Sequence, residues 1–353
     1  MSDASLAVPK KRLVDLLPIL ILAGLFVLGL MSRLGQIFDW KNEFILSIIE
    51  RVSNFSAVFL GIFIEAAPYL LLGTLASGLI EVFFSAQELS RLLPRNKILS
   101  VSLGGLLGLF FPVCECGSIP LARRLMRKGV PVPVGVAFLL AAPVINPIVI
   151  ASTFAAFGNT AIFWLRFGLT FLIAVGVGLL FLFEPEANHI LKFDHQESDH
   201  SFHFHPENAA GEVPASSLGQ KLQRTAMIAA DEFFEMGRFL VVGALLAASM
   251  QTFIPQNYLL ALGQGPLLSV FVLSILAVLL SICSTVDSFV ALAFTGTFTS
   301  GSILAFLVYG PMVDIKATLM YLRVFKKRIV IVLVLLPLLL TLVAGVAVNL
   351  WVR

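Results

Sequence analysis

The residues best suited to chemistry stand in two short segments that each follow an apolar run. "PVCECGS" (112–118) holds two of the chain's three cysteines, Cys114 and Cys116, on either side of Glu115. "ICSTVDS" (282–288) holds the third, Cys283. Thiols are soft ligands that suit soft, polarizable centres such as trivalent arsenic or a thiophilic metal. Three cysteines without the spacing of a disulfide framework indicate individual thiols.

The elements that carry these segments are predicted to be membrane helices. The chain has 353 residues, of which 58% are hydrophobic and only 13% charged, and its mean hydropathy is +0.97. A soluble domain would carry roughly twice that charge. Apolar runs of about 20 residues, the length that crosses a bilayer, recur along the chain. We therefore expect an all-α, polytopic helical membrane protein with no nucleic-acid partner.

The first apolar run, 13–31, follows Lys10, Lys11 and Arg12. It is too long for a signal-peptide core and is read as a retained span whose start is cytoplasmic. Further apolar runs cover 52–80, 98–113, 131–157, 160–183, 227–252, 267–282, 301–322 and 329–352. The predicted domains are 1–50 (tail, first span and outer loop), 51–183 (first repeat), 184–224 (linker) and 225–353 (second repeat).

The two halves resemble each other in sequence. "EAAPYLLLG" (65–73) aligns with "EMGRFLVVG" (235–243), and "AFLLAAPVIN" (137–146) aligns with "AFLVYGPMVD" (305–314). Between these two matches, Cys114 aligns with Cys283 at a similar offset. Polar residues and prolines that match in the same order predict an internal repeat, which is a recurrent design of secondary transporters.

Charged loops predict that the repeats are inverted. The first-half linkers around 91–97 and 123–128 are basic, whereas their second-half counterparts, 252–266 and 295–302, carry no charge. If basic loops are cytoplasmic, residues 98–122 and 267–294 must each enter the membrane and return on the same side. The expected architecture has about seven full spans and two re-entrant hairpins.

The cysteine segments would then be the tips of those hairpins, approaching the midplane from opposite faces. Non-helical backbone at that depth is tolerated where it lines a cavity, and freed helix ends can bind a polar solute. The candidate solute-binding residues at the tips are Cys114, Glu115, Cys116, Ser118, Cys283, Ser284, Thr285 and Asp287. We expect Cys114 and Cys283 to share one site and Cys116, two residues along an extended tip, to point elsewhere. The alternative is that these small residues only permit close helix packing.

The "PVCECG", "AAPVINP", "CSTVDSF" and "YGPMVDIK" segments resemble the ArsP-type permease family, and the resemblance extends over about residues 50–350. It implies a membrane permease, and some members of that family export trivalent organoarsenicals such as methylarsenite. It also implies that Asn146 and Asp314, in the proline-containing spans, belong to the transport site. It does not identify the solute.

Other ionisable residues inside the apolar runs are expected to face the protein interior. Glu65 and Glu235 occupy matched positions and are candidates for ion coupling, although Arg238, three residues after Glu235, favours a local ion pair there. Arg166 and Lys316 are expected to extend toward the membrane surfaces.

All five histidines lie in "HILKFDHQESDHSFHFH" (189–205). Imidazole is a common metal ligand, so this stretch either binds a metal or is a solvated cytoplasmic linker; the metal question stays open. No cofactor is expected.

Two functions remain open at this stage. The first is a permease of the cell inner or plasma membrane that exports a small thiophilic or amphipathic solute and is not an enzyme. The second is a membrane thiol-disulfide or electron-transfer protein that uses Cys114 and Cys116, although Cys-x-Cys differs from the Cys-x-x-Cys of thioredoxin-like centres. No G-x-x-x-x-G-K-[ST] loop is present. Solute, direction, coupling ion and oligomeric state are not indicated.

Overall fold

The structure is a computed structural model that describes residues 43–85, 87–89, 93–111, 113–183, 190–192, 218–253, 265 and 267–351. The predicted first span, the histidine-rich stretch beyond Leu191 and Lys192 and most of the 252–266 loop lie outside these residues. Within them the regular elements are helices, with one isolated bridge between Leu191 and Phe325.

The first half contains α2 (Glu43–Phe83), α4 (Lys97–Leu106), α5 (Glu115–Arg127), α6 (Val132–Ala141), α7 (Pro147–Phe157) and α8 (Ala161–Leu180). The second half contains α10 (Leu218–Phe253), α12 (Leu268–Leu280), α13 (Asp287–Leu292), α14 (Ser300–Met312), α15 (Ile315–Val324) and α16 (Lys327–Trp351). One-turn 3-10 helices follow α4 and α8, at Leu107–Leu109 and Phe181–Phe183.

Five helical segments in the described part of the chain are long and apolar enough to cross a bilayer: Ile49–Phe83, Ala161–Phe183, Leu218–Thr252, Ser300–Val324 and Lys327–Trp351. With four shorter apolar helices beside them, they confirm the prediction of an all-α, polytopic membrane protein.

Two of the expected spans are broken near their middles. The run 131–157 forms α6 and α7, which have 10 and 11 residues and are each about 15 Å long, half of a bilayer core. The run 301–322 forms α14 and α15 in the same way. Pro147 begins α7, and Pro311 lies in the last turn of α14. Because proline removes a backbone donor and clashes with the preceding turn, both sequences favour a helix end there.

Each cysteine segment lies in a hairpin that returns to its starting side. In the first half, Gly104 lies against Val134 and Gly108 against Ala142, so α4 and α6 run parallel and α5 must lead the chain back. In the second half, the Ser302 hydroxyl binds that of Ser269 at 2.6 Å, and Gly310 lies against Ala277. Helices α12 and α14 are therefore parallel as well.

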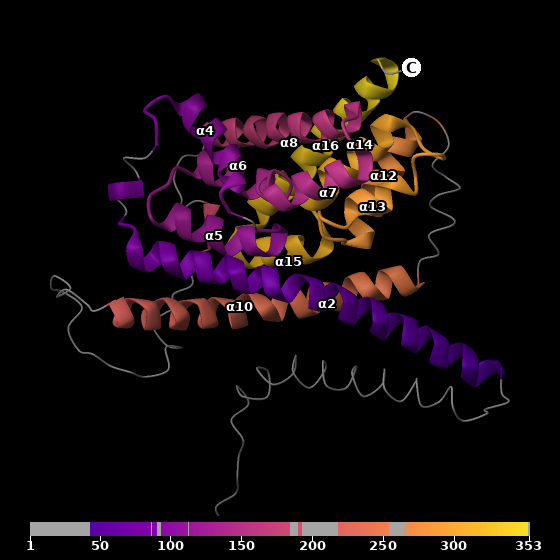
Figure 1. The fold of residues 1–353 in the computed structure, drawn as a ribbon, viewed down its shortest axis with the longest axis horizontal. Coiled ribbons are helices and arrows are strands. Elements are labelled where there is room, and N and C mark those ends of the chain that lie inside the picture. The colour runs from indigo at the N-terminus through magenta and orange to yellow at the C-terminus, as the bar shows by residue number, and fades with distance from the viewer. Residues whose placement is uncertain are drawn as a thin grey trace, which may run out of the picture.

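Helices α2 and α10, which begin the two halves, pack side by side along one edge of the bundle (Figure 1). Gly78, near the end of α2, contacts Thr225, near the start of α10. Phe59 lies in one hydrophobic cluster with Val241 and Ala244. The two long helices are therefore antiparallel, and the hairpins and broken helices stack over them (Figure 1).

Candidate functional site

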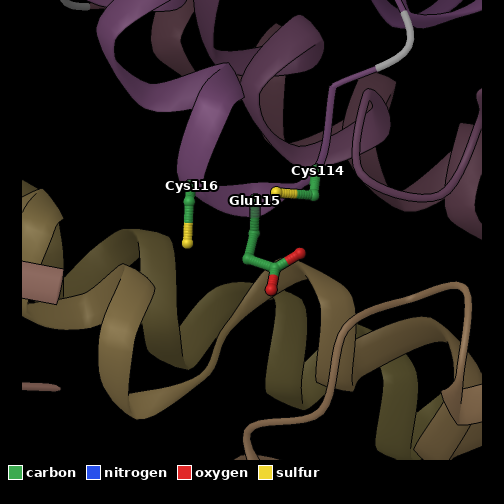
Figure 2. Close-up of side chains that lie close together, drawn as sticks. All are labelled: Cys114, Glu115 and Cys116. Carbon is green, nitrogen blue, oxygen red and sulfur yellow. The ribbon is translucent and has the colours of Figure 1, made fainter. Parts of the chain in front are cut away.

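The first tip is the turn that begins α5. Cys114 is the N-cap residue, and its carbonyl accepts hydrogen bonds from the amides of Gly117 and Ser118. Cys114, Glu115 and Cys116 therefore form the first turn of a helix, and one ligand atom from each lies within 4.8 Å of the others. Figure 2 shows all three side chains at this turn, with Glu115 and Cys116 directed toward the second-half helices. The tip is helical rather than extended as expected, and the Cys116 thiol, although it points in a different direction from that of Cys114, stays within 4.8 Å of it.

The second tip follows α12. The helix ends at Ser281, whose φ of 45° lies in the left-handed region, a common helix-ending conformation that is rare outside glycine. The hydroxyl of Ser281 accepts a hydrogen bond from the amide of Ile315 at 3.3 Å. The chain then turns at Cys283, whose carbonyl binds the amides of Val286 and Asp287. The break between α14 and α15 thus helps to hold this tip.

The two tips bring the three thiols together. The Cys114 thiol lies within interaction range of the thiols of Cys116 and Cys283, and the Cys283 thiol lies within interaction range of the carboxyl group of Glu65 on α2. All three cysteines are free and buried. The halves therefore contribute thiols to one cluster, and one of the two matched glutamates contacts it.

A cavity of about 10 Å³ adjoins the thiols, about the room that one water molecule needs. It is lined by Tyr69, Val113, Cys114, Asn146, Ile148, Cys283, Ser284 and Thr285. The hydroxyl of Ser284 is buried and has no hydrogen-bond partner among the described residues. Both tips and the break after α6 thus meet around one small space.

A buried ion-pair cluster fixes the first tip to the second half. The Lys316 ammonium lies 3.3 Å from Glu115 Oε1 and 3.3 Å from Asp314 Oδ2, and its exposed fraction is only 1%. The expectation that Lys316 extends to the surface is wrong: two carboxylates compensate its charge, which makes burial tolerable. Glu115 Oε2 is buried and has no hydrogen-bond partner in the described part of the chain.

A second buried ion pair fixes the second tip to the first half. Arg166 on α8 is completely buried and donates to both Asp287 carboxylate oxygens, at 3.0 and 2.8 Å. It also binds the hydroxyls of Thr153 on α7, at 3.0 Å, and Ser288, at 2.7 Å. The expectation that Arg166 extends to an outer surface is wrong as well, and Asp287 serves to hold the tip.

Three other predicted site residues are held by local hydrogen bonds. Asn146 caps α7 by accepting from the Val149 amide at 3.0 Å, and Asp314 caps α15 by accepting from the Ala317 amide at 2.6 Å. The Ser118 hydroxyl binds the Glu115 carbonyl inside α5. Asn146 also lines the cavity, as do Ser284 and Thr285.

Glu235 lies in a different environment from its sequence match, Glu65. Its carboxylate is ion-paired with Arg123 on α5 at 3.2 Å and with Arg323 on α15 at 3.1 Å. Both of these arginines come from segments that are distant in the sequence. Glu235 therefore ties three helices together, away from the thiols.

Sequence reasoning missed that Tyr69 lines the cavity, one helical turn after Glu65, and that Lys316 and Arg166 act at the tips. For Lys316 and Arg166 the sequence did contain a signal. Each is a basic residue within or beside an apolar run, and burying its charge is costly unless a partner is near.

Comparisons with known proteins fit this architecture. A family described as predicted permease, of the ArsP type, matches residues 51–350. The UPF0718 protein YcgR of Bacillus subtilis is 44% identical over 280 residues, which cover 79% of this chain and 91% of that protein. A Streptococcus mutans protein, provisionally named a two-component membrane permease complex subunit, is 39% identical over 276 residues, which cover 78% of this chain and 88% of that protein.

No solved structure matches the chain. The family match extends over both halves, both cysteine tips and both broken helices, and the two relatives are similar over more than three quarters of the chain. The chain therefore belongs to the ArsP family of predicted permeases.

Proposed function

We propose that this permease is a secondary transporter that exports a small thiophilic solute through a site between two inverted repeats. The observation that carries the proposal is the convergence of Cys114, Cys116 and Cys283 from both halves, with Cys114 and Cys283 lining one small cavity. Thiols attract soft centres such as trivalent arsenic. A trivalent organoarsenical is therefore the solute class that fits the site and the family resemblance best.

The antiparallel α2 and α10, and the parallel helices that flank each hairpin, support the inverted-repeat part of the proposal. Transporters of this design bind solute near the midplane at discontinuous helices. The cavity holds about one water molecule, so a larger solute needs the tips to separate. Exchange between states open to either side would then move it.

Glu65 is the better candidate for ion coupling. Its carboxyl group contacts the Cys283 thiol, so a proton on it can respond to solute at the thiols. Glu235 instead sits between two arginines, an arrangement that favours a structural role.

The relative from Streptococcus mutans carries the name of a complex subunit, and we extend that to a second component for this chain. Purification of the tagged chain from its own membranes, with the co-eluting proteins identified, tests this. Elution as a single species after mild solubilisation would contradict it.

The function is tested by transport of methylarsenite into inverted vesicles, with and without a proton gradient. Because a trivalent arsenical with two exchangeable valences gains from two thiolates, Cys114→Ser and Cys283→Ser should each abolish uptake. The double variant should be little worse than either single one. If Cys283→Ser transports like the parent at equal membrane expression, the shared thiol site is wrong.

The same variants separate transport from redox function. A thiol-disulfide protein would cycle Cys114 and Cys116 into a disulfide, and Cys283→Ser would leave that cycle intact. A carrier would instead show all the thiols protected from labelling when solute is bound.

A further inference from the structure

The thiol cluster lies beside several carboxyl groups and one ammonium group. Lys316 is ion-paired with Glu115 and Asp314 and interacts electrostatically with Glu65. One ammonium therefore faces three carboxyl groups. The surroundings of the thiols therefore offer carboxylate oxygens as well as sulfur, which are both donors that a zinc-like cation accepts.

One oxygen of Glu115 has no partner in this cluster. Oε1 faces Lys316 at 3.3 Å, whereas Oε2 is buried and has no hydrogen-bond partner in the described residues. The exposed fraction of Glu115 is 2%, and a carboxylate oxygen lies within 4.8 Å of the thiols of Cys114 and Cys116. An orphaned, buried acceptor next to two soft donors is an arrangement that a metal ion would satisfy.

The donor set suits a particular class of metal. We propose that Cys114, Cys116, Cys283 and Glu115 form a binding site for a thiophilic divalent cation of the zinc and cadmium type. The inference rests on the proposed function, because it assigns a cationic substrate class to the same transport site. Each thiol would release its proton to solvent as its metal–sulfur bond forms, and Lys316 would remain as the counter-charge to the anionic complex.

The geometry needs only a small contraction. Zinc binds thiolates at about 2.3 Å in tetrahedral sites, so neighbouring sulfurs lie about 3.8 Å apart. The atoms of Cys114, Glu115 and Cys116 already lie within 4.8 Å of one another, and Cys283 completes a set of four through its contact with Cys114. A carboxylate beside three thiols favours a borderline divalent ion over a purely thiol-bound monovalent one. Cys114 and Cys283 also line the cavity, so there is space directly beside the cluster.

The test is cadmium binding by the purified full-length protein in detergent, followed by the ultraviolet charge-transfer absorption of cadmium–sulfur bonds. We expect one ion per chain. Replacing any one cysteine by serine should remove about one third of the absorption and weaken binding about tenfold or more. Glu115→Gln should weaken binding and keep the absorption.

Glu232→Gln is the matched control, because Glu232 is a buried glutamate ion-paired with Arg124 outside the thiol cluster; it should bind like the parent. Elution on size exclusion shows that each variant is folded, and Cys→Ala replaces any serine variant that aggregates. Binding that none of the three cysteines affects, or no binding by the folded parent, would overturn the site.

Methylarsenite distinguishes the two proposals. Because methylarsenite is neutral, its binding should require Cys114 and Cys283 but not Glu115. If the protein binds methylarsenite and no cadmium, the cation site is wrong and the proposed function stands. If it binds neither, both are wrong. If it binds cadmium alone, the cation site stands and the organoarsenical assignment is wrong.

Discussion

At the scale of single residues, two buried ion pairs hold the two tips in place. Lys316 of the second half holds Glu115 at the first tip, and Arg166 of the first half holds Asp287 at the second tip. Each pair therefore joins the tip of one half to a helix of the other. Because the ions lie in a low-dielectric interior, loss of one partner leaves an uncompensated charge.

Arg166→Met tests how much such an ion pair contributes to the stability of the protein. It leaves Asp287 buried without its cation, so we expect a loss of about 3–5 kcal/mol of stability, seen as a large drop in the melting temperature of the detergent-solubilised protein. Adding Asp287→Asn should restore part of the loss, because it removes the orphaned charge. Arg51→Met, at an exposed position, is the control. A melting temperature for Arg166→Met equal to that of the control would show that the pair contributes little.

At the scale of elements, matched glycines set the distance between the long helices and the half-helices at the site. A Cβ on Gly73 of α2 would lie 2.3 Å from the Gly117 Cα on α5, and a Cβ on Gly243 of α10 would lie 2.8 Å from the Lys316 Cα on α15. Gly117 follows Cys116, and Lys316 pairs with Glu115. The closeness of these helices therefore positions the chemistry.

Gly73→Ala should force α5 away from α2. Overpacking of this kind costs about 1–3 kcal/mol, and the shift should also weaken solute binding at the adjacent thiols. Gly61→Ala, on the same helix with open space around it, should be neutral or stabilising by up to about 1 kcal/mol. The measurement compares the melting temperatures and the thiol-labelling rates of Gly73→Ala and Gly61→Ala. Equal behaviour would mean that the close approach does not matter.

At the scale of the whole molecule, composition and run length were sufficient to predict a polytopic helical protein, and the parallel pairs α4–α6 and α12–α14 fit the predicted hairpins. The breaks at Asn146 and Asp314 were not predicted, because an apolar run looks the same whether its helix is continuous or capped midway. The pairs Lys316–Glu115, Arg166–Asp287 and Glu235–Arg323 each join residues more than 80 positions apart in sequence. No local pattern encodes such pairs, whereas the three cysteines were found by their chemistry alone.

The molecule's two ends differ in charge, and the predicted topology follows from that difference. At one end, Lys128 donates to the carbonyls of Ile80 and Phe84, and Arg323 reaches Glu235 beside Arg123. At the opposite end, Gly301 binds the side chain of Asn349, and the sequences 252–266 and 295–302 carry no charge. Basic loops stay in the cytoplasm, so the first end should face inward.

Reporter fusions test this orientation and the inverted repeat together. Fusions within 84–97, 184–224 and 323–328 should report a cytoplasmic location, and fusions within 253–266 and at the C-terminus an external one. The opposite locations of 323–328 and the C-terminus follow because α16 crosses the membrane between them. The hairpins return to their own side, so 253–266 and the segment near 299 should share one location with the C-terminus. A cytoplasmic C-terminus would contradict the proposed inverted repeat and, with it, the proposed alternating-access route through the thiol cavity.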